Sequence, residues 1–304
     1  MKPLSFVIIT YNRPAEMLAL ARNISGLRDA SSLLEEVIIL NNASTENYEA
    51  VKSFIQATPQ IPFKWLEAPS NLGVAGGRNY ALRSATAPIL IMLDDDAELE
   101  NEDALIQLVS VYNQSQTDRK LAIVSFKVLY FDNHQMQINA LPHKNFREYS
   151  QQSFFETYYF AGGAHAIRKD VIDQLGMYPE DFFYGMEEYD LGYRLLDAGF
   201  AIVYSDKVVM LHKESPGGRK PKKEKIQMMW VNKSKVAWRY LPKKYFYSTA
   251  ILWSFQYLAE TGFHLAGFFE GWKKITQIPK TEIRKPLKPE TLVYLKKLKA
   301  RLYY

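Results

Sequence analysis

Short apolar runs alternate with longer amphipathic segments through the first half of the chain. The runs are rich in Ile, Val, Leu and Phe and are bounded by polar or turn-forming residues, which is typical of buried strands. The predicted strands cover residues 4–10, 36–40, 63–66, 89–93 and 121–130. The intervening pattern predicts helices between these strands. They cover residues 14–27, a segment that ends at about 57, a segment that runs from a glycine-rich turn at 71–78 to about 83, and residues 105–113.

This alternation, with strands that are apolar nearly throughout, predicts an α/β fold whose mostly parallel central sheet is flanked by helices. Ligands bind such sheets beyond the carboxyl ends of the strands. Three predicted strands end in polar residues, namely Thr10-Tyr11-Asn12, Asn41-Asn42 and Asp94-Asp95-Asp96. We therefore expect a single ligand site at this edge of the sheet.

The pattern changes after residue 150. Residues 158–167 predict a strand that contains the pair Gly162-Gly163, and such a pair allows close approach of a ligand or of another backbone segment. A helix over 187–198, stopped by Gly199, and a strand over 208–211, closed by His212, come next. A loop at 215–218 and a basic run at 219–225 follow, and the remainder is mostly helical.

Composition narrows the class of protein. A chain of 304 residues with 47% hydrophobic residues can bury a full core and is typical of a globular protein. Cysteine is absent, which excludes disulfides and thiolate metal sites and suits the cytoplasm. The first residues lead directly into a strand pattern, so we predict no signal peptide.

Charge divides the chain into two parts. Residues 1–212 carry 17 Lys/Arg and 27 Asp/Glu, a net charge of −10, whereas residues 213–304 carry 21 and 6, a net charge of +15. A basic tail of this kind suits nucleic acid, an acidic membrane surface or an anionic substrate.

The acidic triplet Asp94-Asp95-Asp96 is the strongest chemical signal. Three carboxylates at the end of a buried strand repel one another, and oxygen ligands suit a hard divalent cation such as Mg²⁺ or Mn²⁺. A solvated acidic turn that caps the next helix explains the triplet equally well when it is considered alone.

The ordered set of motifs resembles glycosyltransferase family 2. The matching segments are Val7 to Arg13, Asn42-Ala43-Ser44-Thr45, Asn71 to Asn79, Leu93-Asp94-Asp95-Asp96, Gly162-Gly163, Glu187 to Leu191 and His212. The resemblance covers about residues 4–220 and is nearest to bacterial rhamnosyl- and galactofuranosyltransferases that assemble cell-surface glycans. It implies the GT-A fold, with a catalytic domain over 1–218 and a basic helical region over 219–304. The nucleotide-sugar half would occupy about 1–130 and the acceptor half about 131–218.

The resemblance also implies a reaction. A metal-dependent, inverting enzyme would move sugar from a nucleotide-diphospho-sugar to a hydroxyl of a glycan or lipid-linked acceptor. Asp96, Asp94 and His212 would hold Mn²⁺ or Mg²⁺, with Asp94 also contacting the ribose or sugar and Asp95 sharing these roles. Glu188 would be the catalytic base, beside Glu187 and with Asp190 as the alternate. The nucleotide-sugar would contact Thr10, Tyr11, Asn12, Arg13, Asn42, Asn71, Gly73, Arg78, Asp94 and Asp95. Gly162 and Gly163 would lie on the acceptor side.

Two alternative functions remain open from the residues. A nucleotidyltransferase normally has a glycine-rich loop with Lys or Arg directly after the first strand, whereas this chain has Thr10 to Arg13 there and no glycine before Gly26. A nucleic-acid-binding protein could use the basic tail, although no recognised nucleic-acid motif is present.

The apolar stretch at 245–269 has two interpretations. It is too short and too polar for a membrane span, and one helical face would contain Ile251, Phe255, Leu258, Gly262, Leu265 and Phe269. It is either a helix buried against the catalytic domain or a second subunit, or an interfacial helix that holds the enzyme at the inner face of the membrane.

Overall fold

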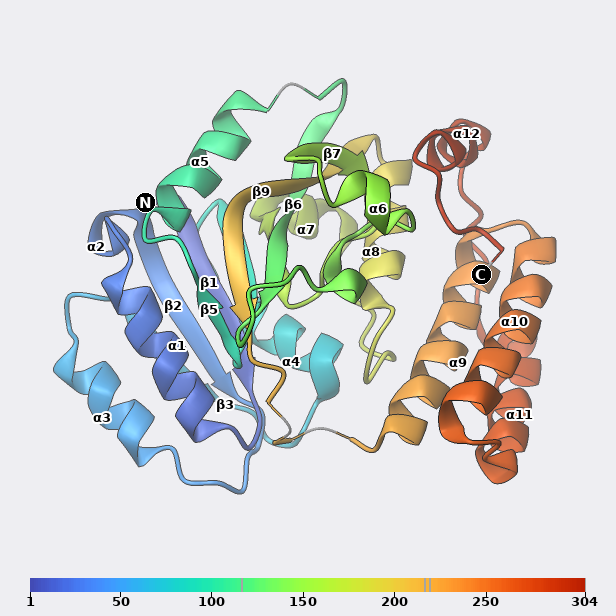
Figure 1. Ribbon diagram of the computed structural model, residues 1–304, viewed down its shortest axis with the longest axis horizontal. Helices are drawn as coiled ribbons and strands as arrows, with labels where there is room; N and C mark the ends of the chain where they lie inside the picture. The colour runs from blue at the N-terminus through green and yellow to red at the C-terminus, as the bar shows by residue number, and fades with distance from the viewer. Residues whose placement is uncertain (116, 216, 219, 304) are drawn as a thin grey trace.

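The computed structural model describes residues 1–115, 117–215, 217–218 and 220–303 (Figure 1). Pro216 of the predicted loop and Arg219 of the predicted basic run lie outside the described residues. The strands are β1 (Leu4–Thr10), β2 (Leu34–Asn41), β3 (Phe63–Glu67), β4 (Ile89–Asp94), β5 (Ala97–Leu99), β6 (Lys120–Tyr130), β7 (Phe154–Thr157), β8 (Ala164–Arg168) and β9 (Phe200–His212).

Helices occupy most of the intervening chain and nearly all of its last third. The α-helices are α1 (Pro14–Gly26), α2 (Ala30–Leu33), α3 (Glu49–Ala57), α4 (Gly73–Leu82), α5 (Ala104–Gln114), α6 (Phe146–Tyr149), α7 (Lys169–Leu175), α8 (Glu187–Asp197), α9 (Lys222–Tyr240), α10 (Lys243–Thr261), α11 (Leu265–Thr281) and α12 (Pro289–Lys297). A 3₁₀ turn covers Ile138–Ala140.

One sheet runs in the order β3-β2-β1-β4-β8-β6-β9-β5, and β7 pairs with β9. Its first four strands are parallel, as the βα alternation predicts. Antiparallel pairing begins at β8, which lies between β4 and β6, whereas β6 and β9 are parallel. The predicted α/β class is therefore confirmed, with a parallel first half and a mixed second half.

Alternate side chains of the central strands enter two separate cores, because neighbouring residues of a strand point to opposite faces. Phe6 and Ile8 of β1 pack beneath α1, α3 and α5. Val7 packs in the other core, together with residues of α4, α7 and α8. The second core continues without a break into α9–α12. The basic C-terminal region is therefore packed against the helices on this side of the sheet (Figure 1).

Two local predictions need correction. The strand predicted at 158–167 begins only at Ala164, and Gly162-Gly163 forms the turn that leads into it. The predicted glycine-rich turn at 71–78 is helical from Gly73 onward. Helical glycines cost stability, and here they allow close contacts: a Cβ on Gly77 would lie 3.3 Å from the Asn42 side chain.

Residues 245–269 do not form one helix, contrary to the prediction. Gly262 adopts a left-handed conformation (φ +63°) that ends α10, and α11 begins at Leu265. Both helices pack on α9 around Trp230, whose indole N–H donates to the carbonyl of Ala250. No helix of the described residues is long and apolar enough to cross a bilayer.

Candidate functional site

The ends of four strands meet at one edge of the sheet. In the parallel half, Thr10 is paired with Asn41 and Ile9 with Asp94. On the antiparallel side, the Asp94 amide donates to the carbonyl of Gly163, and Ala97 is paired with His212. The three polar strand ends expected to converge therefore do so, and they are joined by the glycine pair and by His212.

A cavity of about 590 Å³ opens at this edge. It is lined by the predicted residues Thr10, Tyr11, Arg13, Asn42, Asn71, Gly73, Asp94, Asp95, Asp96 and His212. The rest of its lining comes from other parts of the chain, namely Phe183, Tyr184, Glu214 and the start of the basic region, including Lys220 and Lys225. The cavity lining therefore contains lysines as well as carboxylates.

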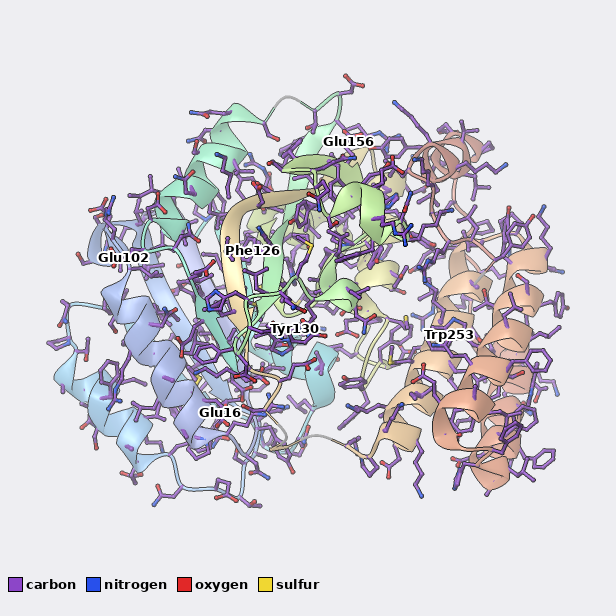
Figure 2. The ribbon with its side chains drawn as sticks, viewed as in Figure 1. Glu16, Glu102, Phe126, Tyr130, Glu156 and Trp253 are labelled. Atoms are coloured by element: carbon purple, nitrogen blue, oxygen red, sulfur yellow. The ribbon has the colours of Figure 1, made fainter. Side chains whose placement is uncertain are left out.

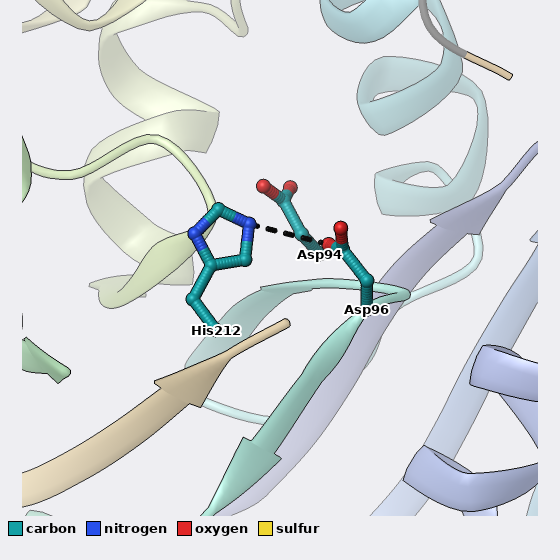
Figure 3. Close-up of side chains that lie close together, drawn as sticks. All are labelled: Asp94, Asp96 and His212. Atoms are coloured by element: carbon teal, nitrogen blue, oxygen red, sulfur yellow. Dashed lines mark ion pairs between the residues drawn. The ribbon is translucent and has the colours of Figure 1, made fainter. Parts of the chain in front are cut away.

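Asp94, Asp96 and His212 form a compact set of potential metal ligands (Figure 3). One ligand atom from each lies within 4.8 Å of the others, and His212 Nε2 is 3.4 Å from Asp96 Oδ1. The other ring nitrogen of His212, Nδ1, donates to Gln137 Oε1 at 3.0 Å. This hydrogen bond favours the tautomer whose Nε2 lone pair faces the carboxylates, as a metal-binding histidine requires.

The electrostatics of this cluster favour a cation. Burial alone would lower the pKa of His212, but its hydrogen bond with Asp96 and the charges of Asp94 and Asp96 raise the pKa above its usual value. Two carboxylates and one imidazole are an oxygen and nitrogen ligand set that suits Mn²⁺ well and Mg²⁺ less well. The residues present therefore fit a divalent metal.

Asp95 points away from this cluster. Its carboxylate accepts hydrogen bonds from Thr10 Oγ1 at 2.8 Å and Arg13 Nη1 at 2.7 Å. Burial raises the pKa of Asp95 to about 6, with Arg13 opposing the increase. Arg13 also donates to the carbonyls of Ser215 and Gly217, so this buried pair anchors the loop that follows β9. We therefore expect Asp95 to order the site, and Asp94 and Asp96 to meet the ligand.

The predicted asparagines shape turns. Asn12 adopts a left-handed conformation (φ 55°), and its side chain accepts from the amide of Thr45, which ties the loops after β1 and β2 together. Asn42 Oδ1 accepts from the amide of Leu72, and its Nδ2 donates to Asn71 Oδ1 at 3.3 Å. Asn42 and Asn71 line the cavity, whereas Asn12 supports it from behind.

Arg78 links the metal cluster to the acidic start of α8. Its buried guanidinium donates to Asp94 Oδ1 at 3.3 Å and to Glu187 Oε1 at 3.1 Å. The glycine pair lies directly against these carboxylates, where no side chain would fit. A Cβ on Gly163 would lie 2.1 Å from Asp94 Oδ2, and one on Gly162 would lie 2.1 Å from Glu188 Oε1. Both glycines are required because the carboxylates pack directly on their backbone.

Glu187 and Glu188 differ in their surroundings. Glu187 is buried against Arg78, and burial raises its pKa. Glu188 is partly exposed. Burial and then the negative charge of Glu187 raise the pKa of Glu188 to about 8, although Arg78 opposes the shift. A carboxylate with an elevated pKa has the properties of a general base. Glu188 is not among the residues that line the cavity, and it lies next to the cavity, beyond Asp94 and Arg78.

Asp190 has a different role from its neighbours. Its two oxygens accept hydrogen bonds from Arg194, Arg239 and Tyr240, at 2.9, 3.0 and 2.9 Å respectively. These contacts turn Asp190 toward α9 and tie α8 to the C-terminal region. Glu188 therefore remains the candidate base, and the geometry disfavours the alternate.

The sequence model of the family described as Glycosyl transferase family 2 matches residues 5–176. The chain belongs to this family. The match contains the strand ends, the acidic triplet and the glycine pair, so the chain is a glycosyltransferase, and neither alternative function raised from the sequence is needed.

Two relatives illustrate the family 2 similarity. An uncharacterised protein of Haemophilus influenzae is 30% identical over 177 residues, which is 58% of this chain and 92% of the relative. The O-antigen chain rhamnosyltransferase WbaN of Salmonella anatum is 25% identical over 190 residues, which is 58% of this chain and 56% of that enzyme.

A solved structure extends the likeness to the fold. The mannosyltransferase PcManGT from Pyrobaculum calidifontis, in complex with GDP-Man and Mn²⁺, superposes with a TM-score of 0.57 at 18% identity. The superposition covers 98% of this chain and 79% of the mannosyltransferase. The GT-A fold predicted from the sequence is thus confirmed.

Sequence reasoning missed one buried lysine of this glycosyltransferase. Lys233, from α9, places Nζ 2.9 Å from the ring centroid of Tyr189, the residue after Glu188. Burial and then Arg301 lower the pKa of Lys233 well below its usual value, with Glu188 opposing. A helical pattern in a basic tail gives no signal that one lysine turns inward, because the contact is with a residue far away in sequence.

The glycine contacts give a testable prediction. Gly163→Ala should displace the Asp94 carboxylate and weaken Mn²⁺ binding by about 10-fold or more, the usual range for disturbing the surroundings of a metal ligand. Isothermal titration with Mn²⁺ alone measures this effect. Gly26→Ala is the matched control, since a Cβ there meets no atom within 4 Å. Equal Mn²⁺ affinity in the Gly163→Ala and wild-type proteins would contradict the proposed role of Asp94.

Proposed function

We propose that this family 2 enzyme is a metal-dependent, inverting glycosyltransferase that uses a nucleotide-diphospho-sugar. The observation that carries the proposal is the cluster of Asp94, Asp96 and His212 at the floor of a cavity beyond the strand ends. A divalent cation bound there would offset the negative charge that develops on the departing diphosphate. The similar mannosyltransferase is in complex with GDP-Man and Mn²⁺, which agrees with this assignment.

The nucleotide would occupy the part of the cavity formed by the first two strand ends. Tyr11 can stack on a base, and the Asn42 and Asn71 amides lie where they can meet its edge or the ribose. Lys220 and Lys225 of the cavity lining can approach the diphosphate. The donor would thus be enclosed between the catalytic half and the basic C-terminal region.

The acceptor hydroxyl would approach from the side of Gly162 and Glu188. Glu188 would take the proton as the hydroxyl oxygen attacks the anomeric carbon. Glu188 lies beside Gly162 and Asp94 lies beside Gly163, so the base and the metal cluster would act on different parts of the substrates. Attack on the face opposite the leaving group inverts the anomeric carbon.

We further propose a cytoplasmic enzyme of cell-surface polysaccharide synthesis with a glycan or lipid-linked acceptor. The similarity to an O-antigen chain rhamnosyltransferase supports this role. Absence of cysteine also suits a reducing compartment.

Donor binding can be tested by thermal shift. A panel of nucleotide sugars should raise the melting temperature of the wild-type protein in the presence of Mn²⁺, because ligands that bind the folded state stabilise it. Asp96→Ala should abolish the Mn²⁺-dependent part of the shift. Asp132→Ala, at an exposed position away from the cavity, is the control. A Mn²⁺-dependent shift that survives in Asp96→Ala would move the metal site elsewhere.

The base assignment predicts a separate effect on transfer. Glu188→Gln keeps the shape of the side chain and removes its basicity, so transfer should fall by at least ~10²-fold while the donor-induced thermal shift is retained. Glu290→Gln, on the exposed start of α12, should leave both unchanged. Normal transfer by purified Glu188→Gln would rule this carboxylate out as the base.

The pH dependence follows from the elevated pKa of Glu188. A base acts only when deprotonated, so kcat/KM should rise with pH and level off above about 8. Glu187→Gln removes the neighbouring negative charge, so the rise should move to lower pH. A wild-type profile that is flat through this range would contradict the assignment.

A further inference from the structure

The outer face of the α10–α11 hairpin is covered with large, exposed apolar side chains. We call this set the hairpin face: Tyr247, Ile251, Leu252, Phe255, Phe263, Leu265 and Phe269. Its three phenylalanines are exposed to 63%, 70% and 65%. Other sides of both helices are packed on α9, so the hairpin face points away from it. Figure 2 shows side chains that project from the outer side of α10 and α11.

Lysines extend the rows of exposed apolar residues on both helices. Lys243 precedes Tyr247 by one helical turn on α10, and Lys273 follows Phe269 by one turn on α11. The start of α9 adds further lysines beside the hairpin turn, because Lys222 pairs with Glu260 at 3.2 Å and Gln227 donates to the carbonyl of Gly267. Lys223, Lys243 and Lys273 are exposed and have no ion pair among the described residues.

We propose that the hairpin face inserts into the headgroup region of an anionic lipid bilayer. Exposed aromatic and aliphatic residues flanked by lysines are the combination that binds such an interface, through apolar burial and attraction to acidic lipids. The charge of the region selects this occupant over a second copy of the chain. Lys223, Lys243 and Lys273 are the exposed lysines beside this face without an ion pair among the described residues, so two such surfaces would repel, whereas an acidic bilayer attracts them.

The placement of the face connects it to the catalytic cavity. Lys220 and Lys225 line the cavity, and α9 begins between them at Lys222, which contacts the end of α10. The start of α9 therefore joins the cavity wall to the hairpin turn (Figure 1). A protein held by the hairpin face would keep its cavity next to the membrane surface, which suits an acceptor hydroxyl on a lipid-anchored glycan. This last step rests on the proposed function.

Flotation of the full-length protein with vesicles tests the proposal. The protein should float with vesicles of phosphatidylcholine and phosphatidylglycerol and less with phosphatidylcholine alone, and added salt should reduce the binding. Phe255→Ser, Phe263→Ser and Phe269→Ser combined should weaken binding by about 10-fold or more, because three large apolar side chains no longer leave water. Failure of the wild-type protein to float with anionic vesicles at low salt would overturn the proposal.

A matched triple variant controls for loss of exposed apolar residues in general. Ile138→Ser, Ile283→Ser and Val293→Ser change equally exposed positions outside the hairpin face and should float like the wild type. A second test variant combines Lys223→Gln, Lys243→Gln and Lys273→Gln and should lose the salt-sensitive part of vesicle binding. This variant tests the proposal even if the phenylalanine variant misfolds. Equal loss of flotation in the control variant would refute the assignment to this face.

Two further measurements separate the alternatives. Sedimentation of the free protein reports self-association: a dimer that the phenylalanine substitutions dissociate, together with no vesicle binding, would assign the face to a second copy. The thermal shift with nucleotide sugars is measured without lipid. Loss of vesicle binding with donor binding intact would refute only the membrane proposal, and the reverse result would refute only the proposed function.

Discussion

A buried guanidinium holds this site together. Arg78 lies between Asp94 of the proposed donor side and Glu187 of the proposed acceptor side, and it is almost completely removed from water. Buried carboxylates at this density would otherwise repel one another and lose their charge. Removing one partner of such a buried set typically costs about 3–5 kcal/mol, because the remaining charges are left without compensation. The positions of Asp94 and Glu187 therefore depend on a single residue of α4.

The acidic residues of the site differ in the positively charged groups that they contact. Arg13 pairs with both Asp95 and Asp96, at 2.7 and 3.1 Å, whereas Asp94 pairs with Arg78. Asp94 and Asp96 also lie within reach of His212. Glu188 has no ion pair of its own among the described residues and lies beside a like charge, which raises its pKa. The contacts of the acids thus differ in the way that the proposed roles of anchor, metal-binding pair and base require.

The sequence predicted the parts of this site that depend on local pattern. Apolar runs located the strands, and parallel topology then brought Thr10, Asn41 and Asp94 to one edge. The pairing of buried Asp95 with Thr10 and Arg13 had no such signal, because residues 95 and 96 form a turn and these partners lie more than 80 residues away in the sequence. The contacts of Gly162 with Glu188 and of Lys233 with Tyr189 had none. They join segments distant in sequence, and only the packed structure fixes which side chains face each other.

The basic C-terminal region completes the catalytic part. Charge changes sign near residue 213, which favours a boundary there, yet the core continues across it. Arg239 of α9 pairs with Asp190 of α8, and Lys233 lies beside the proposed base. Cations of the basic region stabilise the acidic first part of the same chain, and the acids stabilise the cations in return. The two parts, of opposite net charge, therefore form one packed unit. Lys223, Lys243 and Lys273, which are exposed and have no ion pair among the described residues, are then placed to act outward, where an acidic surface would balance them.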